Sequence, residues 1–75
     1  MIALNEINLL EKVTILKILP SPITDKLKEM GLYKDKVIFI KFKAPLGDPI
    51  AIQVDGCLLS LRLSEAQLII VNRDI

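Results

Sequence analysis

The chain is organised around the stretch Ala44-Pro45-Leu46-Gly47-Asp48-Pro49-Ile50, which lies between two segments rich in β-branched and aromatic residues, 37–43 and 50–54. Such segments favour β-strands. The two prolines between them fix φ and bias each preceding residue towards extended conformations, so they predict a stiff loop. We therefore predict a β-hairpin with a rigid tip, in which Gly47 supplies torsional freedom and Asp48 bonds neighbouring backbone amides.

The segments on either side extend this hairpin into a small β-rich domain. Asp55-Gly56 is a strong two-residue turn signal, and the segment after it alternates apolar and polar residues. A closed barrel removes exposed strand edges. We therefore predict an all-β fold with one short inserted helix, a small SH3-like five-stranded barrel forming a single domain over residues 1–75. The expected strands are 13–19, 37–43, 50–54, 57–63 and 68–72, with a capped turn at 64–67 and fraying at 72–75.

The one helix is expected between the first two strands. Ser21 before Pro22 is typical of a helix N-cap with proline at the first helical position. Apolar residues follow at helical spacing, and Gly31 stands where a left-handed C-cap residue belongs. Residues 1–12 are expected to be an extended or loop lead-in that covers one end of the barrel.

The composition bears on where the protein works. The chain has 75 residues, of which 52% are hydrophobic. A domain this short buries only ~60% of its unfolded surface, so we expect exposed apolar side chains, which mark a partner site where they are contiguous. No apolar run approaches the ~20 residues of a membrane span, and residues 1–6 do not resemble a secretory signal. We expect a cytoplasmic protein with no membrane insertion, whose single cysteine, Cys57, is reduced and buried.

The residue types argue against an enzyme and against a bound cofactor or metal. The chain has no histidine and one cysteine, so it lacks an imidazole base and the nitrogen and sulfur ligands that zinc prefers. No phosphate-binding glycine loop occurs, and Ser60 and Cys57 have no general base. A net charge of +1 and a scarcity of aromatic residues give little support for nucleic-acid binding. We therefore expect a binding module.

Two regions are candidates for recognition of a protein partner. One is the tip of the rigid loop, where Leu46 projects, although the loop could serve only to fix the hairpin register. The other is the outer face of the strands at 50–54 and 57–63, where Leu58 is exposed. Tyr33, just after the helix, is expected to be partly exposed. The candidate partner-binding residues are Tyr33, Leu46, Gly47, Asp48 and Leu58, and Pro45 and Pro49 hold the loop.

The two phenylalanines, Phe39 and Phe42, both lie in the strand expected at 37–43. Successive side chains of a strand point to opposite faces, and these two residues have opposite parity. We therefore expect at least one of them to pack in the core, with the other under the helix.

Several motifs together resemble the FeoA family, the small cytoplasmic proteins of bacterial ferrous iron transport. The family pattern is a helix ending in Leu-x-x-(Leu/Met)-Gly-Leu, a Pro-Leu-Gly-Asp-Pro hairpin loop, and a Leu-x-Leu-Arg strand followed by Glu-Ala. The loop is the most specific of these motifs. The matching segments are Leu4-Asn5-Glu6-Ile7, Lys26-Leu27-Lys28-Glu29-Met30-Gly31-Leu32, Ala44-Pro45-Leu46-Gly47-Asp48-Pro49-Ile50, Leu59-Ser60-Leu61-Arg62 and Glu65-Ala66.

The resemblance implies an SH3-like barrel with an inserted helix and an accessory or regulatory role in ferrous iron uptake. It implies a partner, the FeoB membrane transporter, which carries a cytosolic G-protein domain. We expect an apolar surface and the rigid loop to dock on that partner, with Lys34 and Lys36 aiding the encounter. Two alternatives stay open: a stand-alone module related to the C-terminal domain of DtxR-type metal-dependent repressors, and a structural homo-oligomer. Weak homo-oligomerisation is also compatible with the first interpretation.

Two positions depart from the family pattern. The family usually has a glycine near the end of the lead-in, where this chain has Leu10, and Pro-Gly after the helix, where this chain has Lys34-Asp35. Both turns are therefore expected to be made differently in this chain, with Asp35 bonding locally.

Overall fold

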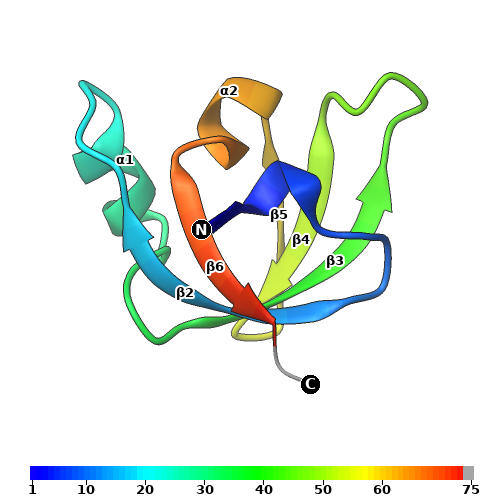
Figure 1. The fold of residues 1–75 in the computed structure, drawn as a ribbon, viewed down its shortest axis with the longest axis horizontal. Helices are drawn as coiled ribbons and strands as arrows, with labels where there is room; N and C mark the ends of the chain where they lie inside the picture. The colour runs from blue at the N-terminus through cyan, green and yellow to red at the C-terminus, as the bar shows by residue number, and fades with distance from the viewer. Residues whose placement is uncertain (74–75) are drawn as a thin grey trace.

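Six antiparallel strands curve around one apolar core in the computed structural model, which describes residues 1–73 (Figure 1). The strands lie in the order β1-β6-β2-β3-β4-β5. The elements are β1 (Ile2–Ala3), η1 (Leu4–Glu6), β2 (Lys12–Ile18), α1 (Thr24–Glu29), β3 (Val37–Lys43), β4 (Ile50–Val54), β5 (Cys57–Leu61), α2 (Leu63–Ala66) and β6 (Ile69–Arg73). The fold is β-rich with one inserted helix, as predicted, and the two-residue β1 adds a sixth strand.

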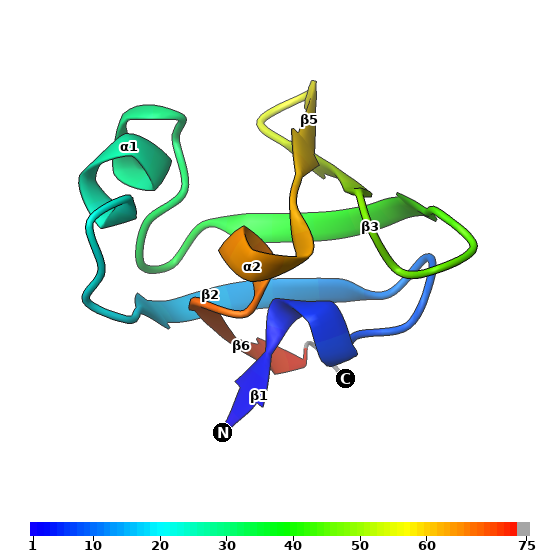
Figure 2. The same ribbon diagram turned by 90° about the horizontal axis from the view of Figure 1, so that it is seen from above.

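Strand pairing leaves the sheet open between β1 and β5, which are its two edges. The prediction that strand pairing removes both edges is therefore wrong. The segments η1 and α2 contact each other, and Figure 2 shows α2 lying between η1 and β5. Short helical segments thus complete the wall of the barrel where hydrogen-bonded strands do not.

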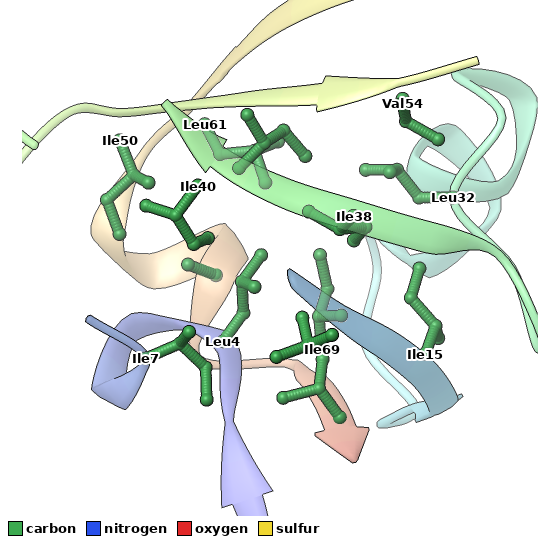
Figure 3. Packing of buried hydrophobic residues seen from close by; sticks show 14 of the residues in the cluster. Leu4, Ile7, Ile15, Leu32, Ile38, Ile40, Ile50, Val54, Leu61 and Ile69 are labelled. Atoms are coloured by element: carbon green, nitrogen blue, oxygen red, sulfur yellow. The ribbon is translucent and has the colours of Figure 1, made fainter. Parts of the chain in front are cut away.

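The core is built from the inward faces of the strands and from the helical segments. Alternate residues of β4 are buried, and β3 contributes Ile38 and Ile40. Leu4 from η1 and Leu27 from α1 are fully buried with them. Figure 3 shows side chains from separate strands pointing toward one another in this cluster. Because fully burying one such side chain stabilises the fold by ~1.5–3 kcal/mol, this alternation determines which face of each strand is exposed.

The central hairpin has the bounds predicted from sequence, 37–43 and 50–54. The next strand, β5, ends at Leu61 rather than at residue 63. Arg62 becomes the N-cap of α2, and its backbone N–H donates a hydrogen bond to Glu65 Oε1 at 2.7 Å. The capped turn expected after this strand therefore begins earlier than predicted, and the strand is shorter than predicted.

The last strand runs further than predicted. Asn72 and Arg73 pair with β2, and Arg73 Nε lies 3.0 Å from Glu11 Oε2 in a salt bridge. The fraying expected at 72–75 is therefore wrong for Asn72 and Arg73. Residues 74 and 75 lie outside the described residues, so a domain that extends to residue 75 stays a prediction.

The inserted helix begins later than predicted. Its N-cap is Ile23, and Ser21 Oγ instead accepts a hydrogen bond from the Ile23 backbone N–H at 3.0 Å, which closes a turn before the helix. The predicted C-cap is confirmed. Gly31 has φ +94°, and the N–H groups of Gly31 and Leu32 bond the last-turn carbonyls of Lys28 and Leu27 in a Schellman motif. No helix within residues 1–73 has the length and apolar character needed to cross a membrane.

Candidate interaction surfaces

The loop between β3 and β4 is closed by its own backbone hydrogen bonds. The Ala44 N–H donates to the Pro49 carbonyl at 3.1 Å, and the Gly47 N–H donates to the Ala44 carbonyl at 2.7 Å. Gly47 has φ +81°, and the peptide bond between Asp48 and Pro49 is cis. Leu46 at the tip is 93% exposed. The loop therefore holds a large apolar side chain in water on a frame tied to the hairpin.

Asp48 bonds an amide far along the chain rather than the neighbouring amides that were predicted. Its Oδ1 accepts a hydrogen bond from the Leu63 backbone N–H at 3.0 Å. Leu63 is the first residue of α2, where N–H groups have no acceptor within the helix. Asp48 thus ties the loop to α2, which gives it a structural role beside any contact with a partner.

An open hollow of about 550 Å³ lies next to this contact, between α1, the loop, the end of β5 and α2. Lys26 of α1 and Met30, the C-cap of that helix, line it on one side, and Asp48, Arg62 and Glu65 line it on the other. Both carboxylates already accept backbone N–H groups. Four separate segments build this hollow, so no single motif in the sequence could have indicated it.

Tyr33 lies in a cluster at the other end of β3. Its side chain is 46% exposed, and the Lys36 Nζ atom lies 5.0 Å from the centroid of its ring. The same Nζ forms a salt bridge with Asp55 Oδ2 at 2.5 Å. The hydrogen bond to Asp55, followed by the smaller contribution of Tyr33, raises the pKa of Lys36 above its ordinary value of 10.5. Lys36 is therefore already paired, whereas Lys34 is exposed.

Both phenylalanines point away from the core, which corrects the prediction made from parity. The pairing of β3 with β4 shifts register between Ile40 and Phe42, so the strand holds one extra residue there. Such a bulge reverses the alternation of the side chains that follow it. Phe42 is 55% exposed and Phe39 is half-buried on the same outer face, where Lys41 Nζ lies 5.2 Å from the centroid of the Phe39 ring.

The first half of β5 is exposed. Leu58 is 67% exposed and stands opposite Gln53, which is itself opposite Phe39. Cys57 is exposed rather than buried, so the prediction of a core cysteine is wrong. Cys57 is paired with Val54, the last residue of β4, and these two residues flank the Asp55-Gly56 turn. Cys57 belongs to β5, which is an edge strand of the sheet.

The structure separates the predicted partner-binding residues into distinct places. Tyr33 precedes β3, and Leu46 follows its end, so the seven residues of the strand lie between them. At ~3.3 Å per residue this is about 23 Å. Leu58 lies level with Phe39, two strands away on the edge strand β5. Sequence reasoning identified these residues singly, but it missed Phe39 and Phe42 as their neighbours because the bulge carries no clear signal in the sequence.

Comparison with protein families gives a match to the FeoA domain over residues 2–73. The chain belongs to the FeoA family. A search of curated proteins gave no match. Among solved structures, the FeoA-like protein from Clostridium acetobutylicum is 41% identical with a TM-score of 0.91, and the match covers 99% of this chain and 87% of that one.

A second FeoA structure, from Stenotrophomonas maltophilia, is complexed with zinc and is described as a prokaryotic SH3 domain protein. It is 26% identical to this chain with a TM-score of 0.85, and the match covers 96% of this chain and 91% of that one. The predicted SH3-like fold is therefore confirmed. In residues 1–73 of this FeoA protein, no three Cys, Asp or Glu side chains gather as ligands for a metal ion.

The same fold occurs in ScaR, whose structure holds bound Zn²⁺. The TM-score is 0.87 at 20% identity, and the match covers 99% of this chain but 37% of ScaR. This likeness shows a shared fold and nothing about shared activity.

The two positions that depart from the FeoA pattern both have a left-handed backbone. Leu10 has φ +66° and Asp35 has φ +73°, the left-handed conformation in which glycine is favoured. Both positions therefore have a backbone conformation that glycine adopts readily, and the prediction that these turns are made differently stays a prediction. The Asp35 backbone N–H donates to the carbonyl of Ile15, a distant residue in β2, at 2.8 Å, which is not the local bond that was predicted.

Proposed function

We propose that this FeoA-family protein is a cytoplasmic accessory protein of bacterial ferrous iron uptake that docks on the cytosolic part of an FeoB-type transporter. It acts by binding and without catalysis. The observation that carries the proposal is Leu46, which is 93% exposed on a loop closed by its own hydrogen bonds. A large apolar side chain held rigidly in water costs little further entropy when a partner covers it, which favours a role in docking.

Docking can regulate the transporter only if the protein binds two of its states with different affinity. The nucleotide-bound and nucleotide-free forms of the G-protein domain are two such states. Preferential binding to one of them shifts the nucleotide or gating equilibrium, and by linkage the nucleotide changes the affinity for this protein by the same factor.

The test is a titration of ¹⁵N-labelled protein with the soluble cytosolic domain of the transporter, with and without a GTP analogue. We expect amide shifts at the loop and at exposed apolar positions such as Leu58, with an affinity that changes with nucleotide. The absence of shifts at high micromolar partner in both nucleotide states would contradict docking on this domain.

A second candidate function, left open by the sequence, is that of a stand-alone module related to the C-terminal domain of DtxR-type repressors. Binding of duplex DNA that weakens steeply with salt would support it, because phosphate contacts release counterions. A third candidate, a structural homo-oligomer, predicts a molar mass in light scattering that rises with concentration.

A further inference from the structure

The outer surface of β3, β4 and β5 carries exposed apolar side chains that the core does not use. We call it the β3–β5 face and define it by the outward residues Phe39, Phe42, Ala51, Gln53, Leu58 and Ser60. The register shift after Ile40 places both phenylalanines on this face, where an unbroken strand would present only one. On the inward side of the same three strands, Ile38, Ile52 and Leu61 are fully buried.

The strand register aligns these side chains in two rows across the face. Phe39 lies opposite Gln53, and Gln53 lies opposite Leu58. Phe42 lies opposite Ala51, which lies opposite Ser60. Directly opposed residues have Cβ atoms about 4.5–5.5 Å apart, so Gln53 separates Phe39 from Leu58 by one strand, and Phe42 adjoins Ala51. The most exposed members are Phe42 at 55% and Leu58 at 67%.

The charges at this face have one sign. Lys12 of β2 lies opposite Phe39, and Lys41 Nζ lies 5.2 Å from the centroid of the Phe39 ring. The strands β3, β4 and β5 contain no Asp or Glu. Asp55, in the turn between β4 and β5, is already paired with Lys36. A partner surface with carboxylates at its rim therefore matches this face.

We propose that the β3–β5 face is the docking surface for an apolar patch with acidic residues at its rim on the cytosolic part of the transporter. This inference rests on the function proposed above and assigns the contact to the outer face of β3, β4 and β5. Lys12 and Lys41 on two copies of this chain would repel each other, so a second copy fits less well. A membrane surface also fits less well, because basic segments that bind anionic lipid carry ~4–8 lysine or arginine residues.

The first arm of the test compares a double variant with a matched control. Phe42→Ala with Leu58→Ala removes the two most exposed apolar groups of the face. We expect this variant to bind the cytosolic domain at least tenfold more weakly than the wild type in calorimetry or fluorescence anisotropy. Leu16→Ala removes an exposed leucine of β2 outside this face and should change the affinity less than twofold. Circular dichroism confirms that each variant is folded.

The second arm tests the charge. Lys41→Glu should weaken binding at least fivefold, and Lys28→Glu, the same charge change on α1, should have little effect. If the wild type binds, and the double variant and Lys41→Glu both bind with the same affinity as the wild type, this surface is overturned while the proposed function stands. No binding of the wild-type protein would overturn both. If the wild-type protein forms a dimer and the double variant is a monomer, the face serves self-association and the proposed transporter contact is overturned.

Discussion

Leu10 and Asp35 occupy equivalent positions at the two ends of the ladder between β2 and β3. The Leu10 N–H donates to the Ile40 carbonyl at 2.8 Å, and the Ile40 N–H donates to the Glu11 carbonyl at 3.1 Å. At the other end, Asp35 and Lys36 make the same two bonds with Ile15, at 2.8 and 2.9 Å. Each arrangement is a bulge whose first residue is left-handed, a place that glycine normally takes.

Replacing Leu10 by glycine should therefore stabilise the protein. The left-handed conformation costs a non-glycine residue ~1–2 kcal/mol, and glycine removes this cost. The greater conformational entropy of glycine in the unfolded chain offsets part of the stabilisation. Because Leu10 is 62% exposed, little packing is lost. We expect Leu10→Gly to raise the free energy of unfolding by ~0.5–1 kcal/mol in urea denaturation. Asp35→Gly should give a smaller gain, since aspartate tolerates this conformation better than leucine.

The control for the Leu10 prediction is the adjacent residue. Leu9 is also exposed, but its φ is not positive. Leu9→Gly should lower the free energy of unfolding by ~0.5–1 kcal/mol, because only the entropic cost remains. Equal effects of glycine at both positions would show that the backbone strain at Leu10 is negligible.

Removing the Asp48 carboxylate should destabilise the connection between the loop and α2. Asp48→Ala leaves the Leu63 N–H without its acceptor, and we expect a loss of ~0.5–2 kcal/mol, as for a helix N-cap. Asp48→Asn keeps a side-chain oxygen and should lose less. Denaturant unfolding gives the stability, and amide exchange at Leu63 reports the bond itself. Unchanged Leu63 exchange in Asp48→Ala would contradict the structural role.

Most of the fold was predictable because local chemistry and burial agree along the chain. The prolines and the β-branched flanks placed the central hairpin, and the Asp55-Gly56 turn is confirmed with φ +52° and +78°. The errors arose where tertiary contacts override local pattern. The bulge near Lys41 exposes Phe42, and the position at a sheet edge exposes Cys57. For the candidate site, sequence could name Leu46 and Leu58, but strand register was needed to place Leu58 beside the phenylalanines.

The loop tip offers a way to separate recognition from stability. Leu46 is 93% exposed, so Leu46→Ser should change the free energy of unfolding by less than ~0.5 kcal/mol. If the loop contacts the transporter, the same variant should bind its cytosolic domain several-fold more weakly. Gly47→Ala is the opposite control, because it should lower stability while the Leu46 side chain is kept. Its Cβ would meet no atom within 4 Å, but φ is +81°, so we expect a loss of ~1 kcal/mol in stability. Leu46→Ser binding as tightly as the wild type would exclude the tip from the interface.

The contact between Lys36 and Asp55 should make stability depend on pH in the alkaline range. The hydrogen bond to Asp55 raises the pKa of Lys36 in the folded state above its ordinary value of 10.5. The stabilisation is therefore complete below 10.5 and is lost as the pH rises through the higher folded value. Asp55→Asn removes the carboxylate and keeps a residue that suits this turn. We expect NMR titration of the Lys36 side chain to give a lower pKa in Asp55→Asn than in the wild type.

The unfolding measurements complete this test. Tyr33 is present in both proteins, so the difference between them isolates the pair formed by Lys36 and Asp55. As the pH rises above 10.5 and through the raised pKa of Lys36, the wild type should lose more stability than Asp55→Asn. Parallel pH profiles, together with an unchanged Lys36 pKa, would mean that the salt bridge has no energetic effect in solution.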